Sequence, residues 1–200
     1  MKMYICGIHT DAGKTHLCVA LCKAFNYSYF KIVQAGCNKD SDILKRFVKN
    51  VKVHKEGIFL NTPASPHIAK KVDNIEYSIN DLILPNDDKM IIELAGGLFC
   101  PIDDNLTMID FMKKHKRKVI LAARNYLGMI NHTILSIKAL QDNGFDIVCV
   151  VMIGEIDTRL DEFIYNYTGV NIAHLEYFDE FNIDEKIQEF KNEIEKYLRS

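Results

Sequence analysis

Short apolar runs alternate along the chain with longer segments whose apolar residues recur every three or four positions. The first pattern predicts strands and the second predicts helices. The runs at 118–123 and 146–153 are apolar at nearly every position, which is typical of strands buried on both faces of a parallel sheet. The expected strands are 3–8, 29–34, 89–94, 118–123 and 146–153, with weaker candidates at 57–60 and 170–174, and the expected helices are 14–26, 40–50, 105–115, 128–143, 158–167 and 182–198.

This alternation predicts an α/β fold, a doubly wound and mainly parallel β-sheet flanked by helices with right-handed crossovers. We expect residues 1–200 to form a single domain of the P-loop type, because no repeat, low-complexity tract or Pro/Gly-rich linker divides the chain. Ligands of such folds bind at the carboxyl ends of the strands. The residues that follow each strand are therefore the candidates for chemistry.

Composition narrows the possible partners. A net charge of −2 without a basic tract argues against nucleic acid as the principal partner. No apolar run reaches the ~20 residues that a membrane span needs, and the first apolar run breaks at Gly7 and His9, unlike a signal peptide. The six cysteines form no C-x-x-C pair and the histidines form no H-x-x-x-H pattern. We therefore expect reduced thiols in a cytoplasmic protein rather than a metal site built on Cys or His.

The first predicted strand leads into a phosphate-binding loop. Gly7 ends the strand and Gly13-Lys14-Thr15 opens the following helix, which is the P-loop arrangement. Lys14 would span the β- and γ-phosphates, and the Thr15 hydroxyl would ligate Mg²⁺. Five residues separate the two glycines, whereas the usual motif has four. The alternative is a chance Gly-Lys-Thr at a helix start, but the flanking strand and helix favour binding of a nucleoside triphosphate.

Charged residues follow two further strands. Lys31 comes at the end of the second strand, before an acidic segment with Asp40 and Asp42, and Glu93 comes before Ala95-Gly96-Gly97. A carboxylate that ends a strand beside a P-loop is a common Mg²⁺ position. Each residue also has a structural interpretation: Lys31 as a surface lysine that contributes little packing, Asp42 as a helix-start residue, and Glu93 as an exposed glutamate before a turn.

Together these motifs resemble the dethiobiotin synthetase family over most of the chain. Six ordered motifs at compatible spacing are more specific than any one of them. They are GIHTDAGKT from Gly7, with the extra loop residue; FKIVQAG from Phe30, with Ile32 where proline is usual; DSD at 40–42; PASPHIA at 63–69; ELAGGLFCPI at 93–102; and LGMINHTILS at 127–136.

The resemblance implies a ligase of biotin biosynthesis that forms dethiobiotin from 7,8-diaminononanoate, CO₂ and ATP, with Mg²⁺ as cofactor and a homodimer as the assembly. It implies catalytic roles for Lys31, Lys14 and Thr10, and Mg²⁺ ligation by Thr15, Asp42 and Glu93. The nucleotide contacts it implies are Asp11, Ala12, Gly13, Lys14, Thr15, His16, Asp42, Glu93, Leu94, Ala95 and Gly96. The substrate contacts it implies are Thr10, Asp11, Lys31, Ala35, Ser65 and His67, with Leu127, Gly128, Ile130 and Asn131 from the second subunit.

Some of these residues have a simpler interpretation. Ser65 with the following proline is also typical of a turn and a helix start, and His67 could be merely structural. The segment that begins at Leu127 could be a simple helix start, although the free N–H groups there suit a carboxylate.

The chain departs from the family pattern at three places. Gly154 stands where many members carry an asparagine that reads adenine, and a glycine cannot supply an amide's donor and acceptor. No Ile-Pro motif occurs near 172–178, and Ala35 stands where a hydroxyl is frequent. We therefore expect that several nucleoside triphosphates are accepted.

Two alternatives compete with this interpretation, and the first is another P-loop phosphotransferase or a related cobyrinate amidation enzyme. The related cobyrinate amidation enzymes need an additional glutaminase domain, for which the chain has no room. The second alternative is a partition-type P-loop ATPase, a nucleotide-switched binding protein. Its loop usually carries an additional lysine close to the first glycine, where this chain has Gly7-Ile8-His9. That difference disfavours the switch protein.

Overall fold

Six parallel strands form the central sheet of the computed structural model, which describes residues 1–199. The sheet order is β2-β5-β1-β6-β7-β8, so the chain order reverses around β1. Such a reversal places the carboxyl end of β1 at the point where doubly wound folds bind ligands. The strands are β1 (Lys2–Gly7), β2 (Ser28–Lys31), β5 (Met90–Gly97), β6 (Lys118–Arg124), β7 (Ile147–Ile153) and β8 (Ile172–Leu175). The predicted α/β fold is confirmed.

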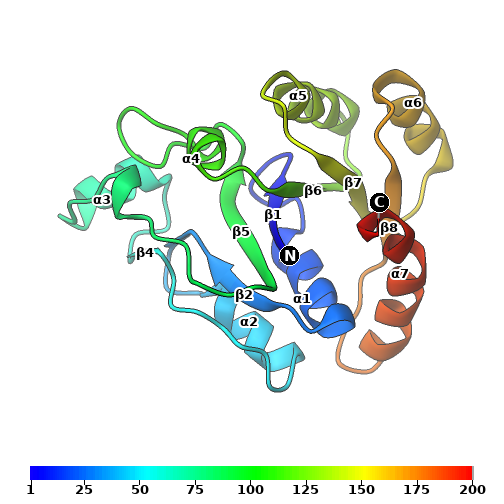
Figure 1. The fold of residues 1–200 in the computed structure, drawn as a ribbon, viewed down its shortest axis with the longest axis horizontal. Helices are drawn as coiled ribbons and strands as arrows, with labels where there is room; N and C mark the ends of the chain where they lie inside the picture. The colour runs from blue at the N-terminus through cyan, green and yellow to red at the C-terminus, as the bar shows by residue number, and fades with distance from the viewer. Residues whose placement is uncertain (200) are drawn as a thin grey trace.

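Helices cover both faces of the sheet (Figure 1). One apolar layer joins the sheet to α1, α2 and α7, and the other joins it to α3, α4, α5 and α6. Alternate residues of β1 enter opposite layers, as the period of a strand requires: Met3 and Ile5 enter the first, Tyr4 and Cys6 the second. The helices are α1 (Lys14–Phe25), α2 (Asp40–Phe47), α3 (Pro66–Val72), α4 (Met108–Lys114), α5 (Met129–Asp142), α6 (Thr158–Thr168) and α7 (Ile183–Leu198).

The predicted strand at 29–34 is divided between two sheets. β2 ends at Lys31, and β3 (Val33–Ala35) pairs with β4 (Ile58–Leu60) in a separate two-stranded parallel sheet. Ile32 is the point of transfer, because its N–H donates to the Glu93 carbonyl of the main sheet while its carbonyl accepts from Ile58 of the small one. This change of sheet directs Lys31 and the segment after it toward the carboxyl end of β5.

Two elements were not predicted. Helix α3 begins at Pro66, and a 3₁₀ helix, η1 (Ile79–Asp81), is closed by a capping box between Ser78 and Asp81. Both are too short to show a helical period in the sequence. Helix α2 also ends at Phe47, three residues before the predicted end.

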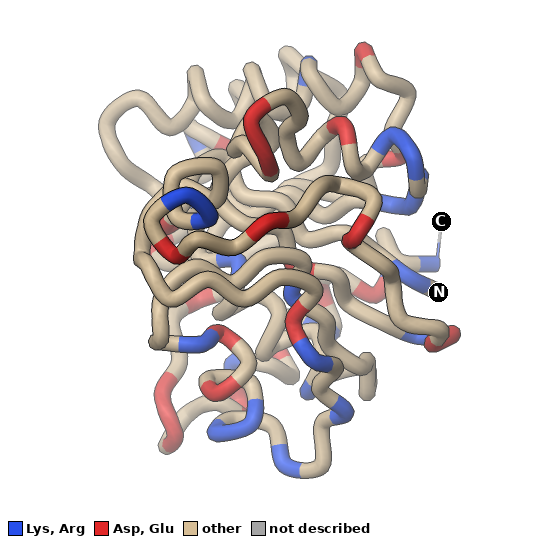
Figure 2. The backbone as a smooth tube through the Cα atoms, turned by 90° about the vertical axis from the view of Figure 1, so that its left-hand side faces the viewer, with Lys and Arg blue, Asp and Glu red and all other residues tan. Residues whose placement is uncertain are grey.

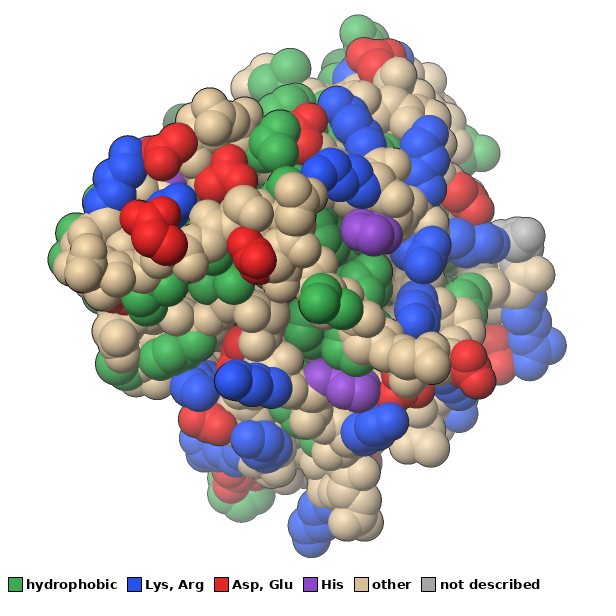
Figure 3. Space-filling model, turned by 60° about the vertical axis from the view of Figure 1, so that its left-hand side comes forward, with side chains coloured by type: hydrophobic (Ala, Val, Ile, Leu, Met, Phe, Trp, Pro, Cys, Tyr) green, Lys and Arg blue, Asp and Glu red, His purple; other side chains and the backbone are tan. Residues whose placement is uncertain are grey.

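The surface carries mixed charge. Lys and Arg positions are interspersed with Asp and Glu positions across the view in Figure 2. Basic and acidic side chains likewise surround hydrophobic ones on the face in Figure 3. All six cysteines are free thiols. Over residues 1–199, none of the helices combines the length and the apolar character that crossing a membrane requires.

A histidine between two carboxylates ties the last strand to its helices. His174 on β8 lies 2.9 Å from Glu193 of α7 through Nδ1 and 2.9 Å from Asp161 of α6 through Nε2. The hydrogen bond to Glu193 is the main reason that the pKa of His174 rises from 6.5 to about 9, with Asp161 adding to it against the effect of burial. The resulting stabilisation is fully present below pH 6.5 and is lost as the pH rises through about 9.

Replacing this histidine should remove that pH dependence. We expect His174→Gln to lower the free energy of unfolding by about 2 kcal/mol at pH 6.5, and by much less above pH 9.5. Urea unfolding at a series of pH values measures the difference. His67→Gln is the control, because His67 pairs with the neutral hydroxyl of Ser65 rather than with carboxylates. Equal losses at both ends of the pH range would exclude the proposed origin of the stability.

Candidate functional site

The phosphate-binding loop connects β1 to α1 at the point where the sheet order reverses. Gly13 precedes the first residue of α1 and has a φ of 86°, a backbone conformation that favours glycine. A Cβ at Gly13 would come within 2.6 Å of Ile153 at the end of β7, so a side chain would also collide with the sheet. This close packing presents the N–H groups that begin α1 to the cavity described below. The predicted strand–loop–helix arrangement is confirmed.

Lys14 is a buried cation at the start of α1. Its Nζ donates to the carbonyl oxygens of His9, at 3.2 Å, and Thr10, at 2.7 Å. Burial, followed by the positive charge of Lys31, lowers the pKa of Lys14, against the opposing effect of nearby carboxylates. A phosphate group beside Lys14 would offset this cost of burying the charge.

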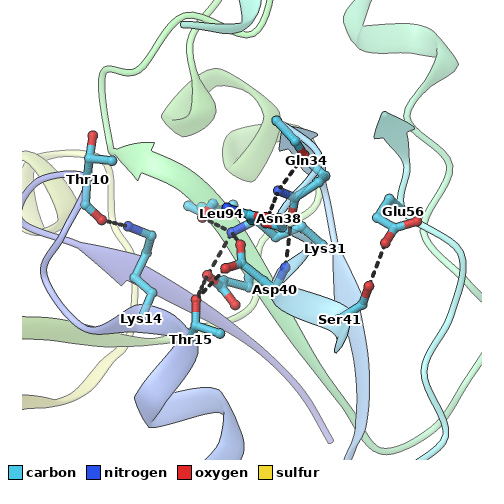
Figure 4. Close-up of polar contacts among 12 residues, drawn as sticks. Thr10, Lys14, Thr15, Lys31, Gln34, Asn38, Asp40, Ser41, Glu56 and Leu94 are labelled. Atoms are coloured by element: carbon cyan, nitrogen blue, oxygen red, sulfur yellow. Dashed lines mark hydrogen bonds and ion pairs between the residues drawn. The ribbon is translucent and has the colours of Figure 1, made fainter. Parts of the chain in front are cut away.

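Four side chains from four different elements meet beside the loop (Figure 4). Lys31 Nζ lies 2.6 Å from Asp40 Oδ2 and 2.7 Å from Glu93 Oε1. Thr15 Oγ1 lies 2.9 Å from Asp40 Oδ1 and 3.1 Å from the same Glu93 Oε1. Lys31 and Glu93 are partners in the β2–β5 register, which is why the sheet holds them together. We call Thr15, Lys31, Asp40 and Glu93 the charged cluster.

The two carboxylates determine the charge of Lys31. Burial by itself would lower the pKa of this lysine, but Glu93 and then Asp40 outweigh burial, and the pKa is raised above its usual range. Lys31 is only 5% exposed and Glu93 is fully buried. The cluster therefore contains a buried, ion-paired lysine, which is not the surface strand-end lysine of the alternative interpretation.

The structure places Asp40, and not Asp42, in the charged cluster. Asp42 is an exposed residue whose carboxylate lies 3.6 Å from Lys45 on the same helix. Two positions along an α-helix differ by about 200° in direction, so only one of the two aspartates can face Glu93. Asp40 is the first residue of α2, and its carboxylate is the one that contacts Lys31 and Thr15. The structure thus brings Asp40, and not the predicted Asp42, beside Thr15 and Glu93.

Gln34 is a site residue that sequence reasoning missed. Its Oε1 accepts from the backbone N–H of Asp40, and its Nε2 donates to the carbonyl oxygens of Gly36 and Asn38. These three bonds fix the turn that leads into α2 and therefore the position of Asp40. The sequence signal was a polar residue within an apolar predicted strand, and the structure shows that this residue is buried.

A cavity of about 690 Å³ opens over the loop and the charged cluster. It brings together most of the predicted site residues and several that were not predicted. The predicted residues in its lining are Thr10, Asp11, Gly13, Lys14, Thr15, His16, Lys31, Ala35, Ser65, Glu93, Ala95 and Gly96. The unpredicted ones are Val33, Gln34, Asp40, Pro63, Ala64, Pro66 and Cys100.

The remaining predicted residues are not in this lining. Ala12 is buried, Leu94 is buried with its carbonyl 3.5 Å from Lys31 Nζ, and His67 pairs with Ser65 at 3.0 Å. Leu127, Gly128, Ile130 and Asn131 lie at the start of α5 and do not line the cavity of their own chain. Gly128 precedes α5 with a φ of 102°, so the predicted helix start is present.

A second groove, of about 700 Å³, lies between α5 and the loop after β5. It shares Thr10, Gly96 and Cys100 with the cavity, so the two spaces adjoin at the P-loop. Its lining includes two exposed apolar side chains, Phe99 at 65% and Leu135 at 59% exposed.

Gly154 follows β7, as predicted, and an aromatic ring occupies the space beside it. A Cβ at Gly154 would lie 2.8 Å from Cε2 of Tyr177. The ring of His16, near the start of α1, stacks on Phe178 with centroids 3.7 Å apart and meets Tyr177 edge-on. Aromatic side chains thus lie where the family pattern carries an amide.

The charged cluster has the donors that Mg²⁺ prefers. Its oxygen donors are two carboxylates and a hydroxyl, which are hard ligands, and Mg²⁺ is usually held by one or two carboxylates together with substrate phosphates. Among residues 1–199, the structure contains no group of three or more His, Cys, Asp or Glu side chains that could hold a metal ion by themselves. The residues present therefore fit a magnesium–nucleotide complex better than a metal held by protein ligands alone.

The chain is similar to known proteins along its whole length. The family model described as an AAA domain matches residues 1–182. An ATP-dependent dethiobiotin synthetase BioD from Campylobacter jejuni subsp. jejuni serotype O:23/36 is 47% identical over 199 residues, covering 100% of this chain and 98% of that protein. The protein of that name from Christiangramia forsetii is 35% identical over 202 residues, covering 96% of each chain.

Solved structures support the fold. A ParA family ATPase from Chlorobium tepidum superposes with a TM-score of 0.55 at 14% identity, covering 100% of this chain and 92% of that one. The pNOB8 ParA bound to nonspecific DNA gives 0.54 at 12% identity, covering 99% and 98%. Likeness at such low identity extends to the P-loop architecture alone, whereas the sequence relatives match the chain in full. The chain belongs to the dethiobiotin synthetase family, and it is an ATP-dependent carbon–nitrogen ligase of biotin biosynthesis.

Proposed function

We propose that the cavity carries out the ring closure of 7,8-diaminononanoate with CO₂ and ATP, with the whole chain acting as one P-loop domain. The observation that carries the proposal is the adjacency of Lys14, Lys31 and Asp11 in one cavity lining. Two anions, a carbamate and a triphosphate, must meet in this reaction, and both lysines are available to reduce their repulsion. An acidic side chain beside them suits an amine substrate.

The chemistry would proceed in three balanced steps. One amine of the substrate adds to CO₂ and loses a proton, which gives a carbamate. A carbamate oxygen attacks the γ-phosphorus, ADP leaves, and a carbamic–phosphoric anhydride forms. The second amine then attacks the anhydride carbonyl, phosphate leaves with the bridging oxygen, and the amine loses its proton to close the cyclic urea. The net reaction is diamine, CO₂ and ATP to dethiobiotin, ADP and phosphate.

Named residues would have separate tasks. The N–H groups that begin α1 and the Nζ of Lys14 would hold the phosphates. Lys31 would lie against the carbamate and the transferring phosphoryl group, and Thr10 and Asp11 would face the diamine. Ser65, which also lines the cavity, would contact the rest of the substrate.

We propose that Thr15, Asp40 and Glu93 hold Mg²⁺ when the nucleotide is bound. The ion would supply charge neutralisation on the triphosphate. The three oxygen donors already converge, because Thr15 Oγ1 lies within 3.1 Å of both carboxylates. Lys31 contacts the same two carboxylates, so the ion and the lysine would share them.

The second groove supports a homodimer. The exposed apolar side chains of Phe99 and Leu135 in its lining are of the kind that a second copy covers. Because the groove adjoins the cavity at Thr10, the partner's helix start at Gly128 would reach the substrate's carboxylate there. Sedimentation equilibrium tests this: we expect a dimer that Leu135→Glu dissociates, and a monomeric parent protein would refute it.

The free thiols are consistent with a cytoplasmic location.

Oxygen tracing tests the proposed sequence of steps. With ¹⁸O-labelled bicarbonate as the source of CO₂, the bridging oxygen of the anhydride comes from the carbamate. The released phosphate should therefore carry one ¹⁸O atom, after correction for exchange with water. Unlabelled phosphate alongside normal dethiobiotin formation would rule out attack of a carbamate oxygen on ATP.

Base discrimination should be weak. Gly154 supplies no side-chain amide, and the aromatic ring of Tyr177 occupies the space beside it. Stacking on aromatic rings tolerates every base, because each has a π-face. We expect kcat/KM for ATP, GTP and CTP to agree within about tenfold, since no paired hydrogen bonds select one base. Steady-state kinetics with the diamine at saturation measures this, and a preference for ATP above a hundredfold would mean that other groups read the adenine.

A further inference from the structure

Tyr29 is a buried tyrosine that contacts Glu93 of the charged cluster from the apolar layer between the sheet and α1. It lies on β2 two residues before Lys31, so both side chains lie on the same face of the sheet. Tyr29 is fully buried, and its hydroxyl donates to Glu93 Oε2 at 2.7 Å. It is a member of the apolar layer that packs the sheet against α1 and α2, together with Leu17 and Cys18.

The two oxygens of Glu93 have different partners. Oε1 lies 2.7 Å from Lys31 Nζ and 3.1 Å from Thr15 Oγ1, on the side of the cavity lining. Oε2 accepts from Tyr29 on the side of the apolar layer. The phenol therefore fixes the rotation of the carboxylate about its last torsion, a torsion that is otherwise broad. One oxygen is tethered to the core and the other faces the reactants.

Packing alone does not call for a hydroxyl at this position. A phenylalanine would fill the same apolar space, and burying a hydroxyl costs free energy unless the group is hydrogen-bonded. A charged acceptor makes such a bond stronger than one to a neutral group. The hydroxyl of Tyr29 is therefore best explained by its contact with Glu93.

We infer that Tyr29 is a positioning residue, which holds Oε2 of Glu93 so that Oε1 is presented to the magnesium–nucleotide complex. This inference rests on the proposed role of Glu93 as a magnesium ligand. Tyr29 is fully buried and does not line the cavity, so it would act through Glu93. Its loss should raise the Mg²⁺ concentration that tight nucleotide binding requires, and should leave metal-free binding unchanged.

Tyr29→Phe is the test, and Tyr4→Phe is its matched control. Tyr4 is an equally buried tyrosine of the same sheet, on β1 and in the opposite apolar layer, and its hydroxyl donates to the backbone oxygen of His115 at 2.9 Å. Calorimetric titration with a non-hydrolysable ATP analogue over a Mg²⁺ series gives the half-saturating Mg²⁺ concentration. Outer contacts of metal ligands typically change metal affinity by 10–100-fold, so we expect a rise of about tenfold for Tyr29→Phe and no change for Tyr4→Phe.

A mutant cycle assigns the effect to Glu93. In a Glu93→Gln background, Tyr29→Phe should add less than about twofold to the Mg²⁺ requirement, because the carboxylate it positions is gone. A Mg²⁺ requirement within twofold of the parent for Tyr29→Phe would overturn the inference, and so would equal losses in both tyrosine variants. Because this readout needs no diamine, a protein that fails to form dethiobiotin yet passes the binding test would refute the proposed reaction and leave the role of Tyr29 standing.

Discussion

Lys31→Ala is expected to lower kcat by about a thousandfold, the scale on which a single stabilising charge or donor contributes to a transition state. Lys31 lines the cavity and is ion-paired with Asp40 and Glu93. Without it, the carbamate and the γ-phosphate would approach each other with less positive charge between them. Phosphate release with diamine, CO₂ and ATP all saturating measures the loss, and kcat within tenfold of the parent would remove Lys31 from the mechanism.

Lys31→Ala should also lower the free energy of unfolding. A lysine at an exposed strand end would contribute little packing, and its removal would leave the fold intact. The structure instead shows a buried lysine whose loss leaves Glu93 without its closest cation, a change that typically costs about 3–5 kcal/mol. Lys70→Ala is the control, since Lys70 is also buried but lies outside the cavity lining. An equal loss of kcat in both variants would attribute the effect to unfolding.

Asp40→Asn is expected to lower kcat/KM by about a hundredfold at moderate Mg²⁺, whereas Asp42→Asn should stay within twofold of the parent. Asp40 contacts both Lys31 and Thr15, so an amide there would remove one charge from the charged cluster. The carboxylate of Asp42 instead pairs with Lys45 at the surface, on the same helix. Both variants keep the volume and polarity of the side chain, so each controls for the other.

The reverse result would restore the assignment made from the motif. If Asp42→Asn were the impaired variant, α2 would have to turn its other face toward Glu93 when the reactants bind. Repeating the comparison over a Mg²⁺ series adds a second criterion. The loss in Asp40→Asn should shrink as the Mg²⁺ concentration rises, because a weakened ligand set fills at higher concentration.

The long strands and helices and the phosphate-binding loop could be predicted from the sequence. The continuous apolar runs at 118–123 and 146–153 predicted buried strands, and they correspond to β6 and β7. The P-loop motif already places a glycine at position 13, where the φ of 86° favours glycine. The division of 29–34 at Ile32 was not predictable, because both halves are apolar and the transfer between sheets depends on backbone partners far along the chain.

The charged cluster was only partly predictable from the sequence. Lys31 ends β2 and Glu93 is its register partner on the neighbouring β5, so the pairing of the two strands brings them together. The choice between Asp40 and Asp42 depended on where α2 begins, and a shift of two residues reverses the face of a helix. Tyr29 acts by donating a hydrogen bond to Glu93, which is far along the chain, and Gln34 acts by accepting one from the backbone N–H of Asp40. Hydrogen-bond partners of this kind leave no pattern in the sequence, so they follow only from the three-dimensional structure.

Phosphate release with each reactant omitted in turn tests the proposed function most directly. The protein is incubated with Mg²⁺ and ATP, with or without 7,8-diaminononanoate and CO₂, and phosphate and dethiobiotin are measured in the same samples. We predict that phosphate release requires both the diamine and CO₂, and that one dethiobiotin forms for each phosphate. Phosphate release that ignores both, and that rises only when a protein partner is added, would contradict the proposal and favour a nucleotide-switched binding protein.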